Sequence, residues 1–123
     1  MKRALVIDDD PCFRELLARL LAVEFDVRLA FDGESALSVL ASDVPDVVLL
    51  DVVLPRTTGS QVLEALRADP RTSGLPVVAF SAGPLGGAVA EAFLRRGGVD
   101  CLVDKLSPPR VFLDATRRAA GAH

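Results

Sequence analysis

Several residue types are scarce in this sequence, and each scarcity narrows the range of functions. The 123 residues include no tryptophan or tyrosine, and the single histidine is His123 at the last position. A flavin would find neither of those aromatic types to stack on. A serine nucleophile would find no histidine base before the last residue. The composition therefore argues against a flavin carrier and against a serine hydrolase.

Cysteines, long apolar runs and excess basic charge are also lacking. Cys12 and Cys101 lie far apart and lack metal-ligand spacing, which predicts neither a disulfide scaffold nor a zinc site. No apolar stretch approaches the ~20 residues of a membrane span, and no signal peptide is evident. We therefore expect a cytoplasmic protein with no membrane insertion. The formal charge of −3 offers no basic footprint, so we expect no direct contact with nucleic acid.

The residues that are abundant suit one folded domain. Hydrophobic residues make up 50% of the chain, which contains no linker, internal repeat or low-complexity segment. A chain of this length can bury a core of its own but is too short for a second one. We therefore expect a single domain over residues 1–123.

Short apolar runs alternate with amphipathic stretches along the chain. Five runs are typical of β-strands, at residues 4–7, 27–31, 47–50, 77–80 and 101–103. The stretches that follow them predict five helices, the fourth around residues 88–96 after a glycine-rich segment. With right-handed crossovers, this order predicts a three-layer α/β fold with a doubly wound parallel sheet.

Capping residues and apolar stripes define the predicted helices further. Asp10 and Pro11 suit the N-cap and first position of the first helix, so we interpret Asp10 as a cap, and Thr58 begins a capping box that Gln61 completes. Helical spacing predicts two inward-facing stripes. They are Phe13, Leu16, Leu17, Leu20 and Leu21 in the first helix, and Val111, Phe112, Ala115 and Ala119 in the last.

Polar residues follow four of the predicted strands at their carboxyl ends. Asp8 and Asp9 follow the first strand, Asp51 the third and Ser81 the fourth, while Lys105 lies just past the fifth. The carboxyl ends of parallel strands meet at one crevice, so these groups should meet there. Crowding three carboxylates raises the pKa of at least one unless a cation neutralises them. Hard oxygen ligands favour Mg²⁺ or Mn²⁺.

The same groups suit phosphoryl transfer. A carboxylate can attack phosphorus and form an acyl phosphate. The transfer then requires neutralisation of charge on the phosphoryl oxygens, which a metal ion, a lysine and a hydroxyl can share. Lys105 and Ser81 can supply the last two.

Taken together, these motifs resemble the receiver domain of two-component response regulators over essentially the full chain. The matching segments are Leu5 to Pro11 with Arg14, Ala30 to Leu37, Pro45 to Asp51, Leu54-Pro55, Ser81-Ala82 and Lys105. The resemblance implies a flavodoxin-like fold with strand order 2-1-3-4-5. It implies that Asp51 accepts a phosphoryl group from a histidine kinase or a histidine phosphotransfer protein, and that the protein passes the signal to a downstream protein.

The resemblance also implies roles for the other site residues. Asp9 would bind the metal directly and Asp8 mainly through water, with the Val53 backbone carbonyl as a further ligand. Lys105 would pair with the phosphoryl group, and Ser81 would bond to it and relay the change. The protein would not be an enzyme beyond self-phosphorylation from small donors and slow self-dephosphorylation.

The sequence departs from the family pattern mainly at residues that relay or time the response to phosphorylation, and not at the acceptor Asp51. Leu106 stands where the family usually has a proline with a cis peptide bond, which predicts a trans bond and a shifted loop. Leu102 replaces the usual switch aromatic, which leaves no ring to flip inward. Val53 and Gly83 occupy the positions that tune dephosphorylation, and neither side chain can orient a water molecule. We therefore expect a long-lived phosphoryl group.

Two other functions stay open on the residues alone. One is an unphosphorylated pseudo-receiver that acts only as an interaction scaffold. The missing proline and aromatic favour it slightly, whereas the intact Asp8, Asp9, Asp51 and Lys105 oppose it. The other is a phosphatase with an aspartyl nucleophile, as in the haloacid dehalogenase-like group. That group has a second aspartate two residues after the nucleophile, where this chain has Val53.

Overall fold

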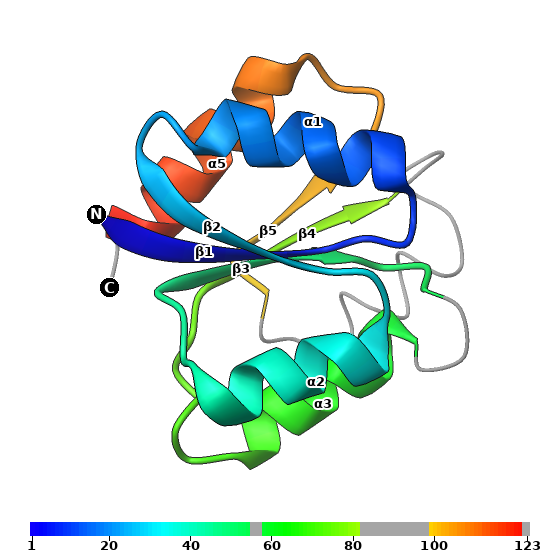
Figure 1. The fold of residues 1–123 in the computed structure, drawn as a ribbon, viewed down its shortest axis with the longest axis vertical. Coiled ribbons are helices and arrows are strands. Elements are labelled where there is room, and N and C mark those ends of the chain that lie inside the picture. The colour runs from blue at the N-terminus through cyan, green and yellow to red at the C-terminus, as the bar shows by residue number, and fades with distance from the viewer. Residues whose placement is uncertain (55–57, 82–98, 122–123) are drawn as a thin grey trace.

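A parallel five-stranded sheet forms the centre of the computed structural model, which describes residues 1–54, 58–81 and 99–121 (Figure 1). The strands are β1 Lys2–Ile7, β2 Phe25–Ala30, β3 Val47–Asp51, β4 Val77–Ser81 and β5 Cys101–Asp104, in the order β2-β1-β3-β4-β5. The described helices are α1 Pro11–Leu21, α2 Gly33–Ser42, α3 Gly59–Ala68 and α5 Pro109–Gly121. The predicted three-layer fold and strand order are confirmed. The helix expected at 88–96 lies outside the described residues.

Two apolar layers enclose the sheet. In Figure 1, α1 and α5 cover one face, and α2 and α3 cover the other. Every residue of β3 and β4 is buried, as expected for central strands covered on both faces. Side chains of β1 and β3 alternate between the two layers, so that Leu5 and Val48 face α2 and α3 while Val6 and Leu49 face α1 and α5.

Side-chain caps begin the helices where the sequence predicts them. The Asp10 carboxylate accepts a hydrogen bond from the backbone N–H of Cys12, which confirms its role as N-cap of α1. Thr58 and Gln61 form the predicted capping box of α3. Asp32 and Ser35 form a second capping box at α2. These bonds satisfy backbone donors that no helical carbonyl can reach.

The predicted apolar stripes are wider than the buried ones. Leu17 and Leu21 are buried, but Leu16 is 48% exposed on the outer surface of α1. In α5, Phe112 is buried whereas Val111 is 37% exposed. Each helix packs on the sheet and on one neighbouring helix, so that only a narrow part of its circumference is covered. No described helix has both the length and the hydrophobicity to cross a membrane.

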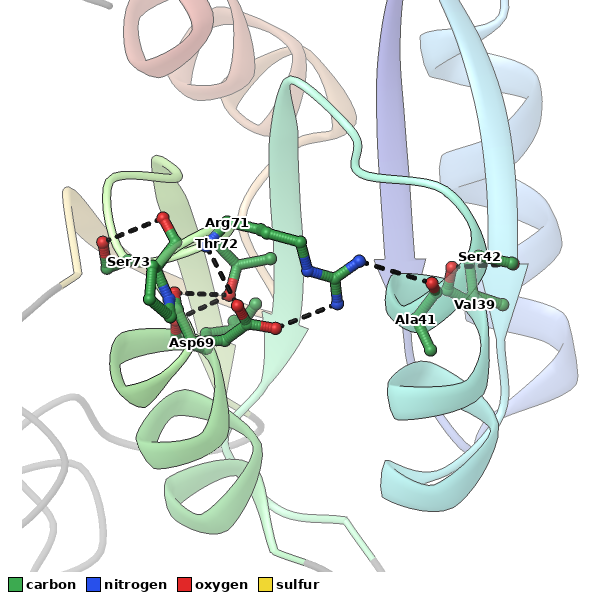
Figure 2. Close-up of polar contacts among 9 residues, drawn as sticks. Val39, Ala41, Ser42, Asp69, Arg71, Thr72 and Ser73 are labelled. Atoms are coloured by element: carbon green, nitrogen blue, oxygen red, sulfur yellow. Dashed lines mark hydrogen bonds and ion pairs between the residues drawn. The ribbon is translucent and has the colours of Figure 1, made fainter.

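A dense hydrogen-bond network closes the amino edge of the sheet, where α2 and α3 end (Figure 2). Arg71 Nη2 donates to Asp69 Oδ2 at 2.9 Å, and Nη1 donates to the Ala41 carbonyl of α2 at 3.4 Å. The buried Thr72 hydroxyl donates to the Leu66 carbonyl at 2.7 Å. Pro70 stands four residues after Leu66 and has no N–H, so Thr72 supplies the donor that the helix lacks.

Candidate functional site

Strand register brings the predicted site residues to one level of the sheet. Ile7 pairs with Leu50 and Asp51 pairs with Phe80, so Asp8 and Asp51 follow side by side at the carboxyl edge. Ser81 pairs with Asp104, which directly precedes Lys105. Carboxylate oxygens of Asp8, Asp9 and Asp51 lie within 4.8 Å of one another. The predicted meeting of three carboxylates is therefore present.

Asp8 is the most enclosed member of this group. Its side chain is fully buried, and Oδ1 accepts a hydrogen bond from the Asp10 N–H at 3.0 Å. The Asp8 N–H donates to the Ala30 carbonyl, and Arg14 Nη1 donates to the Asp8 carbonyl at 2.9 Å. These bonds fix the backbone on both sides of the carboxylate. Asp9, in contrast, is exposed on the solvent side of the cluster.

Lys105 reaches this cluster from the far side of the sheet. Its ammonium lies 3.1 Å from Asp8 Oδ2, donates to Asp8 Oδ1 at 3.3 Å and lies 3.6 Å from Asp51 Oδ2. Burial would lower the pKa of the lysine, but the hydrogen bond to Asp8 and the charges of the nearby aspartates raise it above its ordinary value. The group therefore stays protonated and supplies a fixed positive charge.

The position of Asp51 disfavours the ionised form of its carboxyl. Its side chain is 5% exposed, and burial is the main reason that its pKa rises to about 7. The hydrogen bond from the Val53 N–H to Oδ1, at 3.0 Å, lowers the pKa in part. The Asp8 carboxyl raises it, and the charge of Lys105 lowers it. One carboxyl pKa of the group is therefore raised, as expected, but burial is the main cause and crowding by Asp8 is a lesser one.

The residues present fit a divalent cation. Three carboxylates face a single ammonium. Asp8 Oδ2 is buried and has no hydrogen bond in good geometry from any residue that the structure describes. The Lys105 ammonium lies 3.1 Å from this oxygen, but a buried anionic oxygen with no well-directed hydrogen bond still favours a cation or water that completes its shell. Hard oxygen donors at this spacing suit Mg²⁺ better than a soft metal.

Other predicted site residues lie in consistent positions. Ser81 is buried at the end of β4, and its carbonyl accepts a hydrogen bond from the Lys105 N–H at 2.8 Å. Val53 follows Asp51 at the edge, and its side chain is 56% exposed. The contact of the Ser81 hydroxyl with a phosphoryl group and the use of the Val53 carbonyl as a ligand stay predictions. Gly83 lies outside the described residues.

Three structural roles at the site escape the sequence patterns. A Cβ on Gly59 would lie 2.6 Å from the Asp51 carbonyl oxygen, so α3 starts in direct contact with the end of β3. Asp104 Oδ1 accepts from the Leu106 N–H at 2.9 Å and closes the turn after Lys105. Phe13 lies against the Lys105 ammonium. Gly59 carried a weak signal in its place after a cap, and the Asp104 bond is a local turn between residues two apart. Only the Phe13 contact joins residues distant in sequence.

Comparison with known proteins identifies the family. The model of the response regulator receiver domain matches residues 4–115. The chain therefore belongs to the receiver domain family of two-component signalling. A solved structure of a putative response regulator from Chloroflexus aurantiacus J-10-fl superimposes with a TM-score of 0.88 and 26% identity over 98% of both chains.

Curated relatives match about two thirds of the chain. Response regulator PleD of Caulobacter vibrioides is 43% identical over 81 residues, which cover 65% of this chain and 18% of PleD. The DNA-binding response regulator MtrA of Mycolicibacterium smegmatis is 44% identical over 82 residues, which cover 66% of this chain and 35% of MtrA. The matched region thus spans about a third or less of these relatives.

Proposed function

We propose that this protein is a phosphoacceptor of a two-component phosphorelay, with Asp51 as the residue that receives the phosphoryl group. The observation that carries the proposal is the arrangement around Asp51. A buried carboxylate lies at a strand end with the Lys105 ammonium 3.6 Å away and with Asp8 and Asp9 beside it. Membership of the receiver family supports the same function.

Asp51 and Lys105 have different roles in the phosphoryl transfer. An Asp51 oxygen forms a bond to phosphorus while the phosphorus–nitrogen bond of a phosphohistidine breaks, and the imidazole nitrogen keeps that electron pair. Lys105 neutralises charge that gathers on a phosphoryl oxygen. The ammonium already lies between Asp8 and Asp51, so little reorganisation is needed when the group arrives.

Asp8, Asp9, Asp51 and the Val53 carbonyl would hold Mg²⁺ or Mn²⁺. When bound, such an ion neutralises the carboxylates and a phosphoryl oxygen together. Asp8 contributes an oxygen that lacks a hydrogen bond among the described residues, and Asp9 contributes an exposed one. The ion would also remove the repulsion from Asp8, which helps to keep Asp51 protonated near neutral pH.

The family partners imply where the phosphoryl group comes from and goes to. We infer that a histidine kinase or a histidine phosphotransfer protein donates it, and that a downstream protein reads the result. The Val53 side chain has no polar group to orient water towards the acyl phosphate, which supports slow self-dephosphorylation. The same residue argues against a phosphatase, which would need an acid at that position.

The test is intact mass after incubation with Mg²⁺ and acetyl phosphate. We expect a mass increase of one phosphoryl group in the natural protein and in Asp69→Ala, which changes an aspartate at the opposite edge. Asp51→Ala should show none. If the natural protein gains no mass under these conditions, the interaction-scaffold function replaces the phosphoacceptor function.

A further inference from the structure

Three of the six phenylalanines form one cluster next to Lys105. Phe13 comes from α1, Phe80 from β4 and Phe112 from α5. The Phe13 ring centroid lies 5.5 Å from that of Phe80 and 5.4 Å from that of Phe112. Phe80 and Phe112 are almost fully buried, whereas Phe13 is half-buried. The two core rings therefore hold Phe13 in place from the inside.

The exposed side of this cluster contacts the ammonium. Lys105 Nζ lies 4.7 Å from the centroid of Phe13 and 5.8 Å from that of Phe80. Both distances are within the range of a cation–π attraction. The carboxylates of Asp8 and Asp51 lie 3.1 Å and 3.6 Å from the same ammonium. The ammonium thus contacts two carboxylates and two aromatic rings at once.

The backbone of this loop does not by itself fix the ammonium. Asp104 closes the turn by accepting from the N–H groups of Leu106 and Ser107, and the Lys105 N–H donates to Ser81. The contact to Leu106 needs an N–H, which a proline would lack. These bonds anchor the Lys105 backbone, but four flexible carbons still separate it from the charge. Asp10 also attracts the charge towards the solvent side.

We propose that Phe13 is a positioning residue for Lys105, whose ring keeps the ammonium between Asp8 and Asp51 and ready for the phosphoryl group. The proposal rests on the phosphoacceptor function proposed above. A leucine at position 13 would fill much of the same space but offer no π face. Phe112 provides a matched control, because it belongs to the same cluster and makes no contact with the ammonium that the structure records.

The first readout is spectroscopic and needs no phosphorylation. The chain has only two lysines, Lys2 and Lys105, so ¹³Cε-labelled lysine gives two assignable signals. Lys2 lies elsewhere, where its ammonium donates to the Ala120 carbonyl, and serves as an internal reference. We expect the ring current of Phe13 to shift the Lys105 ε-protons upfield. Phe13→Leu should lose most of that shift, whereas Phe112→Leu should keep it.

The second readout is the rate of mass gain with Mg²⁺ and acetyl phosphate, at a temperature where urea melts show every variant folded. We expect Phe13→Leu to slow the gain by about threefold to tenfold. Phe13→Tyr should restore the rate, because it keeps the ring. Phe112→Leu should stay within about twofold of the natural rate, although loss of a fully buried ring destabilises the fold more.

The outcomes separate this proposal from the function on which it rests. An unchanged Lys105 signal in Phe13→Leu overturns the positioning role. Equal slowing in Phe13→Leu and Phe112→Leu also overturns it, because rate would then follow core stability. If the natural protein gains no phosphoryl group, the phosphoacceptor function fails, and the lysine signals alone still decide whether Phe13 positions the ammonium.

Discussion

The two edges of the sheet use similar polar residues in opposite ways. At the amino edge, Asp69 pairs with Arg71 and the Thr72 hydroxyl bonds to a helix carbonyl (Figure 2). At the carboxyl edge, Asp8 and Asp51 are buried together, and one Asp8 oxygen lacks a hydrogen bond among the described residues. The polar side chains of Asp69, Arg71 and Thr72 are paired within the protein, whereas three carboxylates gather at the carboxyl edge in a group that could hold a metal ion.

The pKa values show the same contrast. The hydrogen bond from Arg71 lowers the pKa of the Asp69 carboxyl, so that group ionises readily in the folded protein. Burial raises the pKa of Asp51 to about 7, so its ionisation opposes folding. A residue type alone therefore does not tell a stabilising carboxylate from a functional one; its burial and partners do.

The largest effect that we expect comes from Asp51→Asn in metal-free protein. The pKa of Asp51 is higher in the folded than in the unfolded state, so the folded protein favours the protonated carboxyl. The stability that this protonated carboxyl contributes is fully present below about pH 4 and is lost as pH rises through about 7. The asparagine variant should therefore gain stability over the natural protein by on the order of 3 kcal/mol between pH 4 and pH 8. Urea unfolding in EDTA across this range measures the difference.

Repeating the urea unfolding with Mg²⁺ tests whether the carboxylates bind the ion. Saturating Mg²⁺ should stabilise the natural protein above pH 7 and stabilise Asp51→Asn less, because the variant has lost one carboxylate ligand. Parallel pH profiles for the two proteins without metal would contradict the buried, strained state of Asp51. Asp69→Asn, at the amino edge, should show no such gain at high pH.

A smaller effect on stability is expected when a methyl group is added at the carboxyl edge, with the same change at the amino edge as the control. In Gly59→Ala, the new Cβ would lie 2.6 Å from the Asp51 carbonyl and 2.7 Å from that of Val52. Neither backbone atom can move without shifting the site, so we expect a loss of about 1–3 kcal/mol in urea unfolding and slower phosphorylation. Gly74→Ala is the control, because its Cβ would meet nothing within 4 Å. Equal effects of the two substitutions would contradict close packing at the carboxyl edge.

The smallest effect is expected at the amino edge. Thr72→Val removes the hydroxyl that donates to the Leu66 carbonyl and leaves that buried oxygen without its donor. We expect a loss of about 1–2 kcal/mol in the free energy of unfolding. Thr72→Ser should recover most of it. Phosphorylation by acetyl phosphate should be unchanged when both variants are compared folded, and a slower rate in Thr72→Val would show that the two edges are coupled.

Much of the fold and site was predictable because it depends on local patterns. Apolar runs predicted the strands, and capping residues such as Asp10 and Thr58 predicted where α1 and α3 begin. Strand ends predicted that Asp8 and Asp51 would meet, because parallel strands share one carboxyl edge. Leu16 and Val111 were wrong as core positions, because helical spacing does not show how wide the covered face of a helix is.

What the sequence by itself determined is the order of elements, the helix starts and the set of acidic and basic groups at the strand ends. These follow from short-range periodicity and from the geometry that all parallel sheets share. Only the tertiary structure decided that Gly59 touches the Asp51 backbone and that Phe13 lies against the Lys105 ammonium. The physical reason is that burial, close approach and charge pairing depend on how separate elements pack against one another, which no local pattern records.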